Sequence, residues 1–69
     1  MRFAVCSGNS VNIRAGAGTQ FRILAVAHKG DLMIAHDGDD PNWKTVAVGA
    51  GDRLVLGSMS AKYIEYIGT

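Results

Sequence analysis

The sequence has few of the residues that cross-link, kink or charge a protein. Of its 69 residues, one is cysteine and one is proline, and aromatic residues make up 7%. A single cysteine excludes an internal disulfide, so a hydrophobic core has to hold the fold together. Seven basic and six acidic residues give a net charge of +1. Because neither sign forms a block, this balance disfavours nucleic acid as a partner.

Long hydrophobic runs are also absent. No apolar stretch approaches the roughly 20 residues that span a bilayer, and no charged and then apolar leader follows Met1. We therefore expect no membrane span. In a segment excised from a longer secreted protein the signal would lie upstream, so these residues do not fix the compartment.

The cysteine and the two histidines suggest no chemistry. Cys6 lies among small and apolar residues, and we expect a buried, small hydrophobic side chain there. A cysteine nucleophile needs a base, and no motif places His28 or His36 beside Cys6. The two histidines would approach one another if their strands paired, but they lack a third metal ligand.

Two further patterns fail on inspection. Residues 16–21 begin like a dinucleotide fingerprint, but the sixth residue is Phe21 and no βαβ unit follows. The segment Asp37-Gly38-Asp39-Asp40 gathers carboxylates, yet Pro41 stands at a ligand position and no glutamate closes a twelve-residue calcium loop. We expect a solvated turn there, and we expect no enzyme activity, metal or cofactor in this chain.

Short apolar runs dominate what is present. Apolar residues make up 48% of the chain, and Gly, Asp and Asn interrupt them at intervals of about 8 to 12 residues, a rhythm typical of all-β sandwiches and barrels. Reversals are expected at 29–31 and 49–52, and one helical turn at 60–63. The expected strands are residues 3–6, 11–15, 22–27, 32–36, 43–48, 53–57 and 64–67.

The second of these segments alternates most cleanly. Side chains in a strand repeat with period two, so Val11, Ile13 and Ala15 are expected to point inward and Asn12 and Arg14 outward. The third segment is apolar on both faces.

Three blocks in order, with a short hairpin segment between the first and the second, resemble the bacterial SH3 domain family. V-N-I-R-A-G-A-G-T followed by Phe21 resembles its leading motif, L-N-V-R-S-G-P-G-T and an aromatic. W-K-T-V at 43–46 resembles its W-Y-K-V strand, Lys29-Gly30 its second hairpin, and G-S-M-S-A-K-Y-I at 57–64 its closing G-W-V-S-S-K-Y-L. The match covers nearly the whole chain. It implies a small SH3-like barrel of five to seven short strands with one short 3-10 turn near the C-terminus.

The resemblance also implies a function. Such domains are appended to bacterial and phage cell-wall hydrolases, so residues 1–69 are expected to be a single domain from a longer chain in the cell envelope or outside the cell. It would bind peptidoglycan or its peptide stems, without catalysis, and tether a hydrolase in the same chain.

Ala17, Lys44 and Ser58 stand where the family has a proline and two aromatics. These losses motivate an alternative, a structural or regulatory domain that packs on its parent chain or self-associates. A third interpretation is a barrel for proline-rich peptides.

A shallow peptide groove uses rigid aromatics for contact and a few polar groups for orientation. Arg14 is expected either to pair with a ligand carboxylate or to be a solvated strand residue. Trp43 and Tyr63 either contact ligand or cover the barrel mouth and the helical turn. Gly16 and Gly18 are expected mainly to shape the loop, with Phe21 over its base. The candidate ligand-binding residues are Asn12, Arg14, Phe21, Trp43, Tyr63 and Tyr66.

Overall fold

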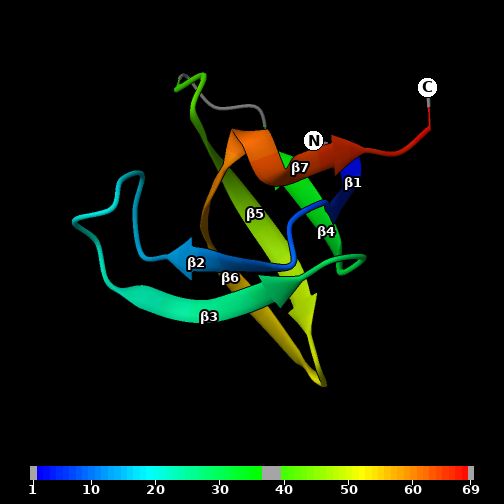
Figure 1. Ribbon diagram of the computed structural model, residues 1–69, viewed down its shortest axis with the longest axis horizontal. Helices are drawn as coiled ribbons and strands as arrows, with labels where there is room; N and C mark the ends of the chain where they lie inside the picture. Colours follow the sequence, from blue (N-terminus) through cyan, green and yellow to red (C-terminus); the bar gives the residue numbers. More distant parts are fainter. Residues whose placement is uncertain (1, 37–39, 69) are drawn as a thin grey trace.

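The computed structural model describes residues 2–36 and 40–68 (Figure 1). The expected all-β class is confirmed, as is the single 3-10 turn near the C-terminus. No helix in these ranges is long or apolar enough to cross a membrane. The elements are β1 (Arg2–Cys6), β2 (Ser10–Arg14), β3 (Ile23–His28), β4 (Leu32–His36), β5 (Trp43–Ala50), β6 (Arg53–Ser60), the 3-10 turn η1 (Ala61–Tyr63) and β7 (Ile64–Tyr66).

All seven strands belong to one antiparallel sheet with the order β3-β2-β6-β5-β4-β1-β7. Over the described residues no ladder joins β3 to β7, so the hydrogen-bonded sheet is open. It is nevertheless strongly curled. β3 lies three places from β5 in the order, yet Cα atoms of the two strands approach within 8 Å. The curl gives the sheet an inner face that encloses a core and an outer face that meets solvent.

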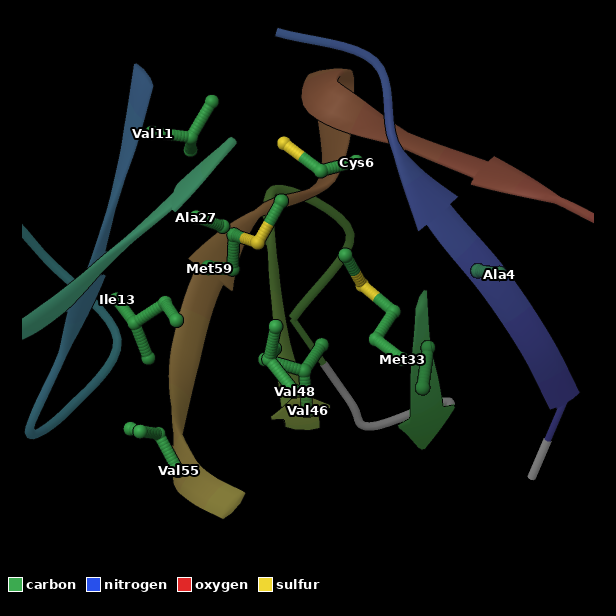
Figure 2. Close-up of a cluster of buried hydrophobic side chains, with 11 residues drawn as sticks. Ala4, Cys6, Val11, Ile13, Ala27, Met33, Val46, Val48, Val55 and Met59 are labelled. Atoms are coloured by element: carbon green, nitrogen blue, oxygen red, sulfur yellow. The ribbon is translucent and has the colours of Figure 1, made fainter. Parts of the chain in front are cut away.

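The inner face is lined by alternate residues of the strands (Figure 2). Val11 and Ile13 are buried as expected, but the expectation for Ala15 is wrong. β2 ends at Arg14, so Ala15 lies exposed at the start of the following loop. Cys6 is buried, as expected, and its thiol donates to the carbonyl of Gly8 at 3.4 Å. The buried residues are Ala4, Cys6, Val11, Ile13, Ala27, Met33, Ala35, Val46, Val48, Val55 and Met59.

The two expected reversals have different outcomes. β5 and β6 form a hairpin in which Ala50 pairs with Arg53 and Gly51 has a φ of 66°. The turn at 29–31 also forms, since the Asp31 amide donates to the carbonyl of His28 at 2.9 Å. The strands that it joins do not pair, however: β3 pairs with β2, and β4 with β1 and β5. His28 and His36 therefore lie on strands that are not neighbours.

β2 crosses β6 at a glycine. The described register between the two strands is the single pair Arg14 and Ser58. A Cβ at Gly57 would lie 2.7 Å from the carbonyl oxygen of Arg14 and 2.7 Å from Cγ2 of Ile13. Only glycine lets the two backbones approach this closely. This contact brings the outer face of β2 beside the end of β6, where the candidate site lies.

Candidate functional site

A groove of about 410 Å³ opens where β2, the ends of β5 and β6, and η1 meet. Its walls come from four separate stretches of chain: β2, the loop after it, the first residue of β5, and the segment from the end of β6 through η1. The lining residues are Ser10, Val11, Asn12, Arg14, Thr19, Trp43, Ser60, Lys62 and Tyr63.

Strand alternation places the β2 wall. Because Val11 and Ile13 are buried in the core, Asn12 and Arg14 lie on the outer face of β2, as the sequence predicts. Thr19 reaches the same groove from the loop.

Backbone pairing places the opposite wall. Trp43, the first residue of β5, is paired in register with Ser60, the last residue of β6. η1 follows at once, and the amide of Ala61 donates to the carbonyl of Asn42 at 2.9 Å. The carbonyl of Tyr63 accepts the amide of Ser7 at 2.9 Å. These bonds fix the backbone of Trp43 at the start of β5 and that of Tyr63 at the end of η1.

Arg14 organises the loop of residues 15–22. Its Nη1 donates to the carbonyl of Thr19 at 3.1 Å and to that of Phe21 at 2.9 Å. The amide of Ala15 donates to the carbonyl of Arg22 at 2.9 Å and closes the base of the loop. No acceptor within the described residues bonds Nε or Nη2 of Arg14. Arg14 is thus more than a solvated strand residue. Its Nη1 stabilises the loop, and its other two nitrogens can still donate to a ligand.

Phe21 packs on the loop rather than in the groove. A Cβ at Gly16 would lie 2.8 Å from three carbons of the Phe21 ring, so the ring rests directly on this glycine. Gly18 has a φ of 150°, a conformation that side chains disfavour. Both glycines therefore shape the loop as expected. Phe21 lies outside the groove lining. Its link to the groove is its carbonyl, which accepts a hydrogen bond from Arg14.

The groove is positively charged. Arg14 and Lys62 line it, and no acidic residue does so among the residues that the structure describes. The Nζ of Lys62 lies 5.1 Å from the centroid of the Tyr63 ring, within cation–π range. Hydroxyl groups and the Asn12 amide supply neutral donors and acceptors. Such a surface suits a ligand that carries carboxylates and peptide groups.

Tyr66 lies elsewhere. It belongs to β7, the edge strand at the far end of the sheet order from β3, and packs partly buried against the core. The guanidinium carbon of Arg2 stacks on its ring, 3.6 Å from the centroid. Tyr66 is outside the groove lining.

The structure therefore brings together four of the six candidates: Asn12, Arg14, Trp43 and Tyr63. The remaining polar lining went unpredicted. Lys62 had a recognisable signal, because it precedes Tyr63 in the closing S-A-K-Y block. Ser60 belongs to the same block and Thr19 ends the leading block, whereas no motif marks Ser10.

Outside the groove, no cluster of three or more His, Cys, Asp or Glu side chains forms a metal-binding arrangement in residues 2–36 and 40–68. Of the acidic segment weighed as a calcium loop, Asp37, Gly38 and Asp39 lie outside the described residues.

Comparison of the chain with protein-family models, with curated proteins and with solved structures gave no match.

Proposed function

We propose that this domain is a non-catalytic binding module that holds a peptide or glycopeptide of the bacterial cell wall in the groove between β2 and η1. In this role it keeps a hydrolase in the same chain close to peptidoglycan. Tethering raises the local substrate concentration without a new catalytic contact.

The observation behind the proposal is where the three family-like blocks meet. The leading block forms β2 and the loop that Arg14 holds; the second begins with Trp43; the third contains Ser60, Lys62 and Tyr63. They are far apart in the sequence, yet all three line one groove. The residues that carry the resemblance therefore share one surface of the molecule.

The chemistry of the groove supports the same ligand class. Arg14 and Lys62 line the groove, and no acidic residue among those that the structure describes does so, which favours the carboxylates of a peptide stem. Trp43 and Tyr63 offer rigid apolar contact. A volume of about 410 Å³ fits a few residues of peptide, within the usual range for ligand sites. Fold closure is part of the proposal: the curled sheet, in which β3 approaches β5, is taken as an SH3-like barrel.

Co-sedimentation with purified peptidoglycan sacculi tests the proposal. The wild-type chain is expected in the pellet, and Trp43→Ala and Lys62→Glu are expected to shift it to the supernatant. Lys29→Glu is the matched control, because Lys29 is an exposed lysine at the turn between β3 and β4, outside the groove. Wild type that stays wholly in the supernatant contradicts the proposal, as does equal loss of binding in Lys62→Glu and Lys29→Glu.

A further inference from the structure

The bulky hydrophobic residues of this chain are distributed unusually. Four of the eleven buried residues are alanine or cysteine: Ala4, Cys6, Ala27 and Ala35. Larger apolar side chains lie outside instead, with Leu54 72% exposed, Leu56 67%, Phe3 60% and Leu32 55%. A domain of this size has little apolar surface to spare from its core. Exposed apolar residues are ordinary when they are scattered and mark an interaction site when they form one contiguous patch.

The exposed residues form one continuous face. The sheet register places Phe3 of β1 opposite Ile34 of β4, Ile34 opposite Ala47 of β5, and Ala47 opposite Leu56 of β6. Two residues further along β5, on the same face of the sheet, Gly49 is opposite Leu54 of β6. We call these residues, with Leu32, the apolar face. They cross four neighbouring strands on the outer side of the sheet.

The apolar face contains both a hollow and projections. The hollow measures about 250 Å³, and the described residues that line it are apolar or glycine: Phe3, Leu32, Met33, Ile34, Ala47, Gly49 and Leu54. Gly49 and Ala47 form its shallow centre because they have little or no side chain. Leu54 and Leu56 stand at its side as the most exposed large apolar residues of the described chain.

We propose that the apolar face is a self-association surface, on which two copies of this chain pack face to face about a two-fold axis. A two-fold interface requires one surface that complements itself. Leucines of β6 in one copy would enter the hollow over Gly49 and Ala47 in the other, and the reverse contact would form at the same time. Two sheets packed in this way form a sandwich.

The area of the apolar face approaches what a dimer interface buries on each copy. Taking about 200 Å² for each fully exposed large side chain, the exposed fractions of its five large residues correspond to about 600 Å² per copy. The largest apolar patch on a typical monomer is about 300–600 Å². A standard interface buries about 800 Å² per partner, so the rim would supply the remainder.

A second copy fits this face better than a polar partner. Within residues 2–36 and 40–68, no charged or hydrogen-bonding side chain lines the hollow, so these residues would not orient a polar or charged ligand. The lining also shares no residue with the groove between β2 and η1. Self-association would therefore leave that groove open.

Sedimentation equilibrium of the 69-residue chain over a wide concentration range tests the proposal. Wild type is expected to approach twice the monomer mass. Leu54→Glu and Leu56→Glu are each expected to weaken association at least about tenfold, because a buried, unpaired carboxylate is costly. Val26→Glu is the matched control: Val26 is an exposed apolar residue of a strand, but it lies on β3, outside the apolar face.

Both leucines are exposed in the monomer, so each variant is expected to fold, and circular dichroism is the check. Wild type that remains monomeric throughout overturns the proposal and leaves the face to a different apolar partner. Dimers that survive in folded Leu54→Glu and Leu56→Glu but dissociate in Val26→Glu also overturn it, because they would pair through the β3 edge instead.

Discussion

Arg14 shows how one side chain can serve both a loop and a binding surface. From strand alternation alone it is an outward-facing arginine, available either to a ligand or to water. The structure adds the two bonds from Nη1 to the carbonyls of Thr19 and Phe21. The fork of the guanidinium suits this arrangement, because one planar group can serve two carbonyls and still present further donors.

Replacing Arg14 tests this positioning role. Arg14→Ala is expected to destabilise the loop by about 1–2 kcal/mol, since it removes two hydrogen bonds from a charged donor at a partly exposed site. The amide of Phe21, which donates to the carbonyl of Gly18 at 3.3 Å, should then exchange with solvent about tenfold faster. Arg22→Ala, an exposed arginine at the end of the same loop, serves as the control. Unchanged exchange at Phe21 would show that the loop does not depend on Arg14.

Gly57 has a steric role that can be measured separately. Gly57→Ala is expected to lower the free energy of unfolding by about 1–3 kcal/mol, because the new Cβ would overlap the carbonyl oxygen of Arg14 and Cγ2 of Ile13. Gly49→Ala is the matched strand glycine: its Cβ would lie no closer than 3.9 Å to the carbonyl of Leu32. Urea denaturation at low protein concentration compares the two. Equal stability of both variants would contradict the close approach of β2 and β6.

At the scale of elements, β6 separates two kinds of hydrophobic residue on one strand. Val55 and Met59 are buried in the core, whereas Leu54 and Leu56 face outward. The sequence Arg-Leu-Val-Leu does not reveal this division, because in a run of consecutive apolar residues both faces of the strand are apolar and no alternation marks the buried one. Only the pairing with β5 decides which of them are enclosed.

Truncations along β6 should reproduce this division. Met59→Ala is expected to cost about 2–5 kcal/mol, because it opens a cavity at a fully buried position. Leu54→Ala is expected to change the stability of the monomer by less than about 0.5 kcal/mol, because its side chain is already in solvent. Denaturant unfolding at low protein concentration measures both. A large loss in Leu54→Ala under these conditions would contradict the assignment of β6 faces.

Local pattern predicted some elements and failed at others for identifiable reasons. The clean alternation of Val11 and Ile13 gave the right buried face of β2, and glycine and aspartate marked the hairpin between β5 and β6. The turn at 29–31 was also recognised, but a turn signal specifies only a local reversal. It does not say which strands will pair, and here β3 and β4 find different partners.

The candidate site was predictable to the extent that its residues have local signatures. Strand alternation predicts that Asn12 and Arg14 face outward as candidate contacts. Trp43 and Tyr63 are candidates because they are aromatic. Phe21 and Tyr66 have the same aromatic character, yet one packs on Gly16 and the other under Arg2. Side-chain type therefore indicates which residues are suited to binding, while the tertiary packing decides which of them share a groove.

At the scale of the whole molecule, the surface carries a polar, cationic groove and, apart from it, an apolar face; the groove and the hollow of the apolar face have no lining residue in common. If both proposals hold, a dimer would present two grooves. Two grooves on one particle would strengthen attachment to a repetitive polymer such as peptidoglycan through avidity.

Thermal unfolding gives an independent sign of self-association. Because dimer formation stabilises only the folded state, the Tm of the wild-type chain is expected to rise with protein concentration. The Tm of Leu54→Glu should stay constant over the same range. A wild-type Tm that is independent of concentration would argue against a dimer, without bearing on the groove.

The most direct test of the central claim is a titration of the isotope-labelled chain with soluble peptidoglycan fragments, followed by amide chemical shifts. Binding in the groove is expected to change and saturate six signals together: the amide shifts of Asn12, Thr19, Ser60, Lys62 and Tyr63 and the indole signal of Trp43. A proline-rich peptide should leave them unchanged. Saturating changes confined to other surfaces, or a response to the proline-rich peptide but not to the fragments, would contradict the claim that this groove binds the cell wall.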